Sequence, residues 1–375
     1  MKINFVTSRY PTENNPYNHM FVHMRCVEFL KMGHDVQVYV PSGERIDYIY
    51  EGVSISKMSA KEIANQLIDG SIIYIHLLNI TPIPSLNGWF IYKHILRKKL
   101  PYVMYVHGNE VQKHSAREFD VTVGFIDFLK RLKKDFYAMP RMETFVKKTK
   151  SIKGSEYIFP SLWMKEEMEK NLNIKLDSYH VIPNGIDTDL FQFHTNFNKA
   201  KKFITIRPLS SKKYAVDIAI HLMSYLPEDC TLDIYGKGNF QTEYEDLIKQ
   251  LGLEKRVKIL NTFIERKNLN STLRNYGVFL SPTRMDAQGV MMCEAMASGL
   301  LTISSDNTAI PEFIKDGHNG ILIDNMNYGD CEKIKSVLES KSKFNEITNN
   351  ARLSMDLINL ENTAILELSI LEKIS

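Results

Sequence analysis

Short apolar runs rich in β-branched residues alternate with longer amphipathic stretches from the start of the chain. This alternation is typical of βα units built around a parallel sheet. In the first half it predicts strands at residues 3–7, 36–40, 72–76 and 102–107, with helical stretches continuing to about residue 150. Residues 21–32 have a helical pattern that stops at Gly33, and Ser59 with Glu62 has the spacing of a capping box that opens a further helix.

The strand pattern starts again in the second half of the chain. It predicts short buried strands at residues 203–206, 231–235, 257–260, 278–281 and 301–304, each followed by a helix. Residues 181–187 form a link between the two series that is punctuated by proline and glycine. We therefore predict an α/β protein of two doubly wound, Rossmann-like domains that face each other across a cleft, with ligands at the carboxyl ends of the strands. The first domain spans residues 1–185, with a C-terminal helix at about 358–375 able to pack back on it, and the second spans residues 186–357.

Composition narrows the class of protein. With 375 residues, 44% hydrophobic and 24% charged, the chain has the size and balance of two folded domains. Its four cysteines form no CxxC pair, which argues against a zinc knuckle or a disulfide framework and fits a reducing cytoplasm. No signal peptide and no run of about 20 apolar residues is recognisable, so we expect a cytoplasmic protein that is not integral to a membrane. A net charge of +3 is too small to indicate binding to nucleic acid.

The strongest chemical signal lies at residues 281–299, where a buried strand ends, a loop follows and a helix begins near Gly289. Backbone N–H groups of Gly289, Val290 and Met291, at the positive end of this helix, would bind a diphosphate. Glu294 lies in the first turns of the same helix among methionine, cysteine and alanine. A carboxylate in such apolar surroundings needs a partner, and its oxygens suit the hydroxyls of a ribose. The alternative is a glutamate on a solvated helix face.

The same segment carries an acidic residue, seven intervening residues and then Glu-Ala-Met-Ala-x-Gly. It resembles the signature of the family 4 (group 1) glycosyltransferases, which have the GT-B fold, and the resemblance extends over nearly the whole chain. The first acid is Asp286, where the family usually has glutamate, and Glu294 is the second. Because a subset of the family is similar in having Asp-Ala-Gln-Gly, we expect altered sugar contacts at Asp286 rather than lost activity.

Other family landmarks follow in order along the chain. Residues 181–187 resemble the segment that links the two domains of the family. Arg207 and Lys212 match an Arg-x4-Lys pair whose charges neutralise the donor diphosphate, with the adjacent Lys213 as an alternative register. By themselves these cations would indicate only a solvated loop. Gly236 and Gly238 resemble a G-x-G turn at the donor site, although alone they would indicate only a tight turn.

The acceptor side of the site is predicted in the first domain. His107, Asn109 and Glu110 resemble the family motif that follows a first-domain strand, while a core histidine is the alternative for His107. After its first strand the family commonly has a glycine-rich loop, which this chain lacks. Asn18 or His19 could reach the sugar or the acceptor from that position instead.

The resemblance implies roles for these residues in sugar transfer. Arg207 and Lys212 would stabilise the charge that grows on the leaving diphosphate. Glu294 would bind the ribose, Asp286 the sugar hydroxyls, and His107 the sugar or the acceptor. The family retains the anomeric configuration, so the resemblance implies retention here.

No metal or other cofactor is expected besides the nucleotide-sugar donor. Asp187 and Asp189 imitate the DxD metal motif of the other main glycosyltransferase fold. Their place inside the link between the domains favours a helix-capping turn instead.

A basic segment gives a hint about the acceptor. Residues 125–153 carry nine cations against three acids, and an apolar stripe recurs among them at helical spacing, at Phe125, Phe128, Leu129, Leu132 and Phe136. Such a helix can lie on an anionic membrane surface, although core packing of the stripe would explain it equally well. Docking on the inner face of the cell membrane would suit a lipid-linked saccharide acceptor, as in bacterial surface polysaccharide assembly.

Two rival functions share the predicted fold. A nucleotide-sugar epimerase would isomerise its substrate without an acceptor, and an inactive subunit would only scaffold a partner, although Arg207, Lys212 and Glu294 argue against the second. A nicotinamide dehydrogenase is disfavoured because no GxGxxG follows the first strand. These motifs leave open the acceptor, the sugar and the nucleotide, which could be UDP, GDP, ADP or dTDP.

Overall fold

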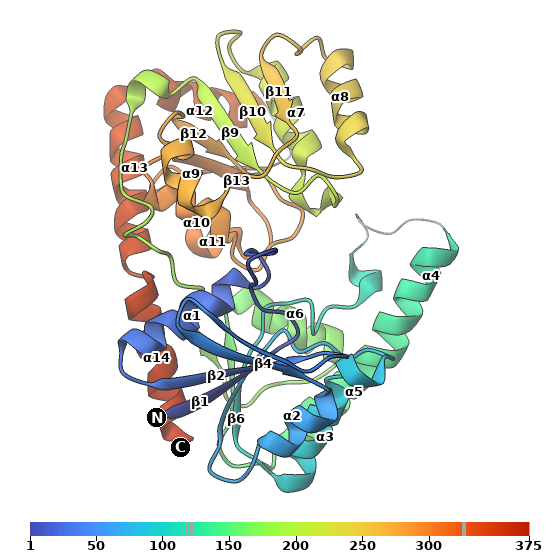
Figure 1. The fold of residues 1–375 in the computed structure, drawn as a ribbon. Helices are drawn as coiled ribbons and strands as arrows, with labels where there is room; N and C mark the ends of the chain where they lie inside the picture. Colours follow the sequence, from blue (N-terminus) through green and yellow to red (C-terminus); the bar gives the residue numbers. More distant parts are fainter. Residues whose placement is uncertain (118, 120–123, 325–327, 375) are drawn as a thin grey trace. The chain divides into compact units, whose positions relative to one another are not determined.

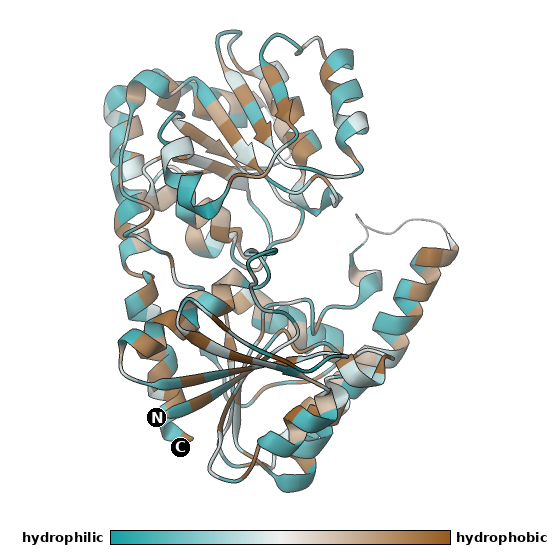
Figure 2. Ribbon diagram, in the orientation of Figure 1, coloured by the Kyte–Doolittle hydropathy of each residue, from teal (hydrophilic) through white to brown (hydrophobic). Residues whose placement is uncertain are grey.

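The computed structural model describes residues 1–117, 119, 124–324 and 328–374. The chain divides into two compact units: unit 1 comprises Met1–Gly185 and Leu360–Ser375, and unit 2 comprises Ile186–Asn359. Each unit has its own sheet (Figure 1) and its own hydrophobic core. Figure 2 shows that apolar positions gather on the central strands of both sheets.

Within the described part of unit 1, eight strands form one sheet in the order β3-β4-β2-β1-β5-β6-β7-β8. The strands are β1 (Lys2–Thr7), β2 (Asp35–Pro41), β3 (Ile46–Tyr50), β4 (Val53–Met58), β5 (Ile72–His76), β6 (Tyr102–Tyr105), β7 (Ser155–Phe159) and β8 (His180–Val181). All neighbouring strands pair in parallel except β3 and β4. The winding reverses between β1 and β5, so the carboxyl ends of these strands form the switch point at which such sheets bind ligands.

Helices cover both faces of this sheet. They are α1 (Met20–Lys31), α2 (Ala60–Gln66), α3 (Trp89–Lys98), α4 (Phe125–Arg131), the π-helix η4 (Leu132–Ala138), α5 (Met139–Thr149), α6 (Leu162–Leu172) and α14 (Leu360–Lys373), with short 3₁₀ turns η1 (Pro84–Leu86) and η2 (His114–Ala116). α1 packs against α14 on one face, while α2, α3 and α5 form a second group on the other (Figure 1). The predicted stop of the first helix is present at Gly33, whose φ is 81°, and the predicted capping box of Ser59 and Glu62 is formed.

Unit 2 has six strands in the order β11-β10-β9-β12-β13-β14 among its described residues, all parallel. The strands are β9 (Lys202–Ile206), β10 (Thr231–Tyr235), β11 (Val257–Leu260), β12 (Val278–Leu280), β13 (Leu301–Ser305) and β14 (Ile321–Ile323). The helices are α7 (Val216–Tyr225), α8 (Gln241–Gln250), α9 (Arg266–Leu273), α10 (Val290–Ala297), α11 (Ile310–Phe313), α12 (Tyr328–Leu338) and α13 (Lys341–Asp356), with 3₁₀ turns η5 (Phe197–Lys199) and η6 (Lys212–Tyr214). The sheet reverses between β9 and β12.

The two sheets confirm the predicted fold class of doubly wound α/β domains. The pattern did not predict β3, β4, β7, β8 or β14. β3 is an edge strand with two half-exposed and three exposed positions, so it lacks the continuous apolar run of a central strand, and β14 is only three residues long. β6 ends at Tyr105, two residues before the predicted end, and His107 lies beyond the strand, where its backbone N–H donates to Oε1 of Glu110.

None of the helices in the described part of the chain is long and apolar enough to cross a membrane.

Candidate active site

The switch point of unit 2 brings together most of the residues predicted for the donor. Arg207 follows β9, Gly236 follows β10, and the loop to Gly289 follows β12. β9 and β12 are neighbours in the sheet, so their carboxyl ends are adjacent although more than 70 residues separate them. Sheets of this topology bind ligands at this place.

Arg207 has the geometry of an anion-binding residue. The residue is only 6% exposed, and its guanidinium lies 5.3 Å above the ring of Tyr214. Among the described residues, Nε and Nη2 of this side chain find no hydrogen-bond acceptor. Burying charged donors without acceptors is costly, so these two groups mark a place where an anionic ligand would be stabilised.

Of the two adjacent lysines, the structure places Lys213, rather than the predicted Lys212, on the ring that Arg207 also contacts. Nζ of Lys212 pairs with Oε1 of Glu243 at 2.8 Å, on the surface of the unit. Lys213 lies 5.3 Å from the ring centre of Tyr214, on which Arg207 also packs, and its charge acts on Asp286 together with that of Arg207. In the 3₁₀ turn η6, successive side chains point about 120° apart. A shift of one residue therefore sends the two lysines in different directions.

Asp286 holds the loop that leads into α10. Its Oδ1 accepts hydrogen bonds from the backbone N–H groups of Gly289, at 3.0 Å, and Gln288, at 3.3 Å. Burial raises the pKa of Asp286, but the charges of Lys213 and Arg207 and these two N–H groups outweigh it, so the net shift is downward. Through Oδ1 this ionised carboxylate orients the loop, and its contact with the sugar hydroxyls stays a prediction.

The start of α10 offers the backbone donors predicted for a diphosphate, with one exception. Gly289 has a φ of 76°, a conformation that favours glycine, and its own N–H is already bound by Asp286. Val290 and Met291 are the first residues of the helix, where N–H groups have no intrahelical acceptor. Two of the three predicted backbone donors are thus in place.

Gly236 and Gly238, in the loop after β10, allow this loop to lie close to the loop after β9 that carries Arg207. A Cβ at Gly236 would overlap the carbonyl oxygen of Arg207, and one at Gly238 would overlap the backbone of Leu209. Backbone hydrogen bonds from Arg207 N to Tyr235 O and from Leu209 N to Lys237 O, both 2.9 Å, join the two loops. The glycines predicted for donor binding therefore let this loop approach and position Arg207.

Glu294 is part of a buried ion pair that the motifs did not predict. Arg266, the first residue of α9, donates from Nη1 to Oε1 of Glu294 at 3.3 Å and from Nη2 to Oδ2 of Asp187 at 3.0 Å. The other oxygen of Asp187 accepts from Leu190 N at 2.9 Å and so closes a turn, although no helix begins at these described residues as the predicted helix-capping turn requires. The need of a buried glutamate for a cation was the only signal in the sequence that pointed to a residue such as Arg266.

The titration of Glu294 leads to a pH-dependence prediction. Burial raises the pKa of Glu294 to about 7, against the lowering effect of Arg266, and the charge of Asp187 adds to the rise. Only the ionised carboxylate accepts from both ribose hydroxyls, so we expect the donor KM to rise as pH falls below about 7. Glu294→Gln should raise the donor KM. In this variant the donor KM should be the same at about pH 6 and about pH 8, below and above the pKa near 7. A pH-dependent KM in that variant would assign the titration to another group.

Three neutral histidines gather at the switch point of unit 1. Nε2 of His107 lies 3.0 Å from Nδ1 of His76, at the end of β5, and the His107 ring packs on Phe21 and Tyr105 at 4.6 and 4.4 Å. The pKa of His107 is well below its usual value, first through burial and then through the charges of His76, Arg25 and His19. Burial, with the charge of Arg9, lowers the pKa of His19 to about 4.

These pKa shifts make His107 a hydrogen-bonding group rather than a charged acid. Nε2 of His76 is buried without a partner among the described residues. A buried lone pair costs less than a buried N–H, which favours the tautomer in which His76 Nδ1–H donates to His107 Nε2. His107 then keeps its proton on Nδ1, as a donor for a ligand.

The remaining acceptor-side residues divide into structural and accessible ones. Glu110 is buried, and its two oxygens accept from the backbone N–H groups of His107, at 2.7 Å, and Gly108, at 3.1 Å, so this side chain shapes the turn. Nδ2 of Asn109 donates to Oδ1 of Asn79 at 3.3 Å. Asn18 is half-buried in the turn before α1, where its N–H reaches Asn15 O.

Comparisons with known proteins agree with this architecture. Residues 187–354 match the profile described as Glycosyl transferases group 1, and residues 20–190 match that described as Glycosyltransferase Family 4. The GtfA subunit of the Streptococcus agalactiae UDP-N-acetylglucosamine–peptide N-acetylglucosaminyltransferase is 28% identical over 42% of this chain and 31% of that protein. An uncharacterized glycosyltransferase of Methanocaldococcus jannaschii is 26% identical over 62% of this chain and 57% of that protein. The chain thus spans less than two thirds of either relative.

Solved structures establish the fold. HepE of Anabaena, in complex with UDP, has a TM-score of 0.72 at 16% identity, covering 98% of this chain and 99% of that one. Sucrose-phosphate synthase of Thermosynechococcus elongatus has a TM-score of 0.70 at 14% identity, covering 100% and 98%. The fold is GT-B, with a parallel sheet in each unit. With both halves matched by their profiles, this chain belongs to the group 1, or family 4, glycosyltransferases.

Proposed function

We propose that this protein is a retaining glycosyltransferase that moves a sugar from a nucleotide-sugar to a saccharide or lipid-linked saccharide. The observation that carries the proposal is the buried guanidinium of Arg207, which has two donor groups without acceptors and lies with Lys213 at the switch point of unit 2. A nucleoside diphosphate supplies the negative charge that this pair lacks. Unit 1 binds the acceptor, with His107 as a hydrogen-bond donor to the sugar.

In the reaction, the bond between C1 of the sugar and the diphosphate oxygen breaks, and a bond from C1 to an acceptor oxygen forms. The diphosphate keeps the electron pair, and the acceptor hydroxyl loses its proton. Arg207, Lys213 and the N–H groups at the start of α10 stabilise the charge on the leaving diphosphate without rearranging. Retention follows from the family resemblance, and the anomeric proton of the product reports it by NMR.

We propose UDP as the nucleotide of the donor. HepE was solved with UDP and glucose, and the pneumococcal GtfA with UDP and GlcNAc. A role in bacterial surface polysaccharide assembly is supported by the relationship to LpsB of Rhizobium meliloti, a lipopolysaccharide core mannosyltransferase that is 27% identical over 44% of this chain.

A donor panel tests this function. UDP-, GDP-, ADP- and dTDP-sugars are compared by thermal shift, because a ligand at 100 times its Kd adds about 2.7 kcal/mol of stability. The stabilising donor is then incubated with acceptors in excess EDTA, since we propose that no metal is required. A new glycosidic bond supports the proposal, whereas an isomerised sugar without a new bond would identify an epimerase. Activity that needs added manganese or magnesium would contradict the metal-free mechanism.

We also propose that the protein docks on the inner face of the cell membrane through α4 and η4. The apolar stripe is exposed rather than packed: Phe125, Phe128 and Phe136 are 74, 55 and 66% exposed. Polar and apolar positions are interleaved along α4 (Figure 2), and Lys130 and Arg131 flank the stripe. An exposed apolar face bordered by cations is complementary to an anionic lipid surface.

A matched pair of variants tests the docking. Phe125→Ser with Phe128→Ser should weaken binding to phosphatidylglycerol vesicles at least about ten-fold, because burying each phenylalanine contributes about 1.5–3 kcal/mol. Ile365→Ser with Leu366→Ser removes two other exposed apolar side chains of unit 1 and should leave vesicle flotation unchanged. If both variants and the wild type float equally with the vesicles, the stripe is an ordinary exposed surface and the docking proposal is wrong.

A further inference from the structure

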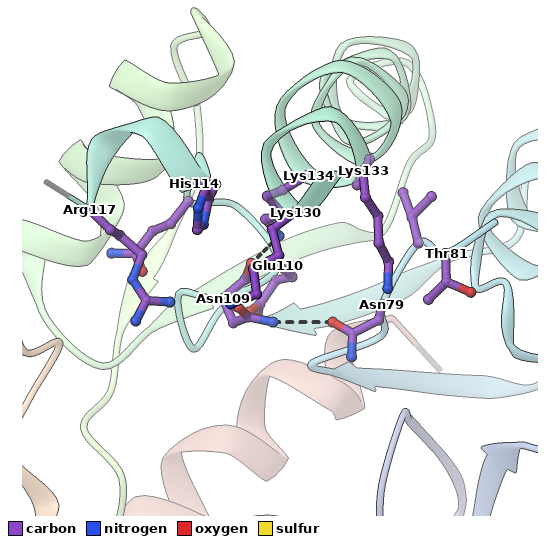
Figure 3. A pocket seen from close by; sticks show the side chains of 12 residues that line it. Asn79, Thr81, Asn109, Glu110, His114, Arg117, Lys130, Lys133 and Lys134 are labelled. Atoms are coloured by element: carbon purple, nitrogen blue, oxygen red, sulfur yellow. Dashed lines mark hydrogen bonds between the residues drawn. The ribbon is translucent and has the colours of Figure 1, made fainter. Parts of the chain in front are cut away.

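A cavity of about 260 Å³ opens in unit 1 beside the ends of β5 and β6 (Figure 3). Its floor comes from the loops after these strands, with Asn79, Thr81 and Asn109, and one wall comes from α4 and η4. Figure 3 shows Lys133 extending from that wall toward Asn79 and Thr81. The cavity is built on the carboxyl edge of the sheet, where α/β proteins bind their ligands.

Positive charge dominates the lining of this cavity. Arg117, Lys130, Lys133 and Lys134 line it with a single carboxylate, Glu110. Lys130 and Lys133 form no ion pair with any residue that the structure describes. Because Glu110 spends both oxygens on backbone N–H groups, it does not offset these cations by direct pairing.

The two acidic residues of α4 and η4, Asp127 and Asp135, contact groups of η2. Asp135 accepts from the backbone N–H groups of His114, at 2.6 Å, and Ser115, at 3.1 Å, and lies 3.8 Å from Arg131. Asp127 lies 2.8 Å from Nε2 of His114. These contacts fasten η2 to α4 and η4 and so fix the cationic wall over the floor.

The cations of the wall repel one another. The pKa of Lys134 is lowered to about 8, first by burial; the charges of Glu110 and Asp135 act against this, and those of Arg117 and Lys133 add to the lowering. Nζ of Lys134 is held by the carbonyl oxygen of Asn109. A multivalent anion in the cavity would relieve this repulsion.

The groups that line the cavity indicate what kind of ligand it binds. Ammonium groups, a guanidinium, three amides and a hydroxyl line the cavity from several directions, which matches the oxygens around a phosphate better than the two oxygens of one carboxylate. The volume is below the usual range for a whole drug-sized ligand and suits a small group. We propose that this cavity binds a terminal phosphate or diphosphate group, and, resting on the proposed function, that this group belongs to the acceptor.

The test uses the full chain with its donor site saturated by UDP and inorganic pyrophosphate as the probe, measured by calorimetry. Lys130→Gln with Lys133→Gln should weaken pyrophosphate binding at least about ten-fold, because two charge-assisted hydrogen bonds to the anion are lost. Lys148→Gln with Lys153→Gln removes the same charge from exposed positions of the same basic segment and should bind as the wild type does. Lys130→Arg with Lys133→Arg should retain binding.

A second measurement separates the sources of the phosphate. Phosphatidylcholine vesicles that carry an isoprenoid diphosphate are compared with soluble pyrophosphate. Tighter binding to these vesicles, lost in the Gln pair, indicates a lipid-borne group, and equal affinity for both indicates a soluble phosphorylated acceptor. The proposal is overturned if the Gln pair binds pyrophosphate as the wild type does, or if the wild type saturated with UDP binds none.

Failure of this inference and failure of the proposed function are distinguishable. UDP binding and slow hydrolysis of the donor by water depend on unit 2 and should be unchanged in the Gln pair. If these activities are absent from the wild type while pyrophosphate still binds the cavity, the proposed function fails and the phosphate site stands. If they are present while pyrophosphate does not bind, only the phosphate site is refuted.

Discussion

Arg207→Ala and Lys213→Ala are each expected to lower turnover by about a hundred- to a thousand-fold, which corresponds to the loss of one pre-aligned group that stabilises developing charge, about 3 to 4 kcal/mol. The charge on the diphosphate grows as the sugar leaves, so turnover should fall more than donor affinity. Single-turnover measurements at saturating donor are needed, because product release can mask the chemical step.

Lys212→Ala is the matched control for this pair. Lys212 is the neighbour of Lys213 and of the same residue type, but it pairs with Glu243 on the surface, so its loss should change turnover little. Glu294→Gln should behave in a third way, raising the donor KM while sparing turnover, because ribose contacts are the same in the ground and transition states. If Lys212→Ala were as damaging as Lys213→Ala, the register of the sequence motif would be right and our assignment from the geometry wrong.

Glu367→Ala is expected to destabilise unit 1 by about 3 to 5 kcal/mol, since it removes one partner of a buried ion pair and leaves the other charge uncompensated. Nε of Arg25 donates to both oxygens of Glu367, at 2.9 and 3.1 Å, and the hydroxyl of Tyr74 donates to Oε2 at 2.7 Å. Nη2 of Arg25 also reaches Oδ1 of Asn184 at 3.1 Å. These bonds join α14 to α1, to the sheet and to the segment that leaves unit 1.

Urea denaturation of the full chain measures this effect, and the transition of unit 1 should move to lower urea while the donor-binding unit keeps its UDP-induced stabilisation. Glu372→Ala, an exposed glutamate on the same helix, should change stability by less than about 1 kcal/mol. Replacing the pair together, Arg25→Met with Glu367→Leu, should cost less than Glu367→Ala alone, because no charge is left buried. An unchanged midpoint for Glu367→Ala would mean that α14 is not held by this network.

The sequence alone determined the class of fold and much of its strand pattern. The strands at residues 72–76, 231–235 and 257–260 were predicted to the residue. The first is a continuous buried run, as in a central parallel strand, whereas the other two are short, mostly apolar segments that each contain one charged residue. The start of α10 at Gly289 was also readable, since a glycine with positive φ at a strand-to-helix turn leaves a local signature. β3 left no such signal, because none of its five positions is buried and exposed positions carry no apolar pattern.

The chemistry of the sites was decided by the tertiary structure. Lys212 and Lys213 differ by one position in the chain, and only the direction of each side chain in a 3₁₀ turn tells them apart. His76 meets His107 because β5 and β6 are neighbours in the sheet. Arg266 meets Glu294 although β10 and β9 lie between β11 and β12, because the helices that carry them both follow the carboxyl ends of parallel strands, at one edge of the sheet. No local pattern encodes such a contact, since it depends on the order of the strands.

In the basic segment, too, the sequence determined one part of the structure and the tertiary packing determined another. Its spacing predicted an amphipathic helix, and the structure has helices α4 and η4 there. Whether the apolar stripe was buried or exposed depended on what packs against it, and no neighbouring element covers it in the described part of unit 1. Likewise, the sequence shows that Lys130, Lys133 and Lys134 are cations, but only the structure shows that they line a cavity opposite the polar loops after β5 and β6. Periodicity along a chain determines which side chains share a face, and only the packing of distant segments determines what that face meets.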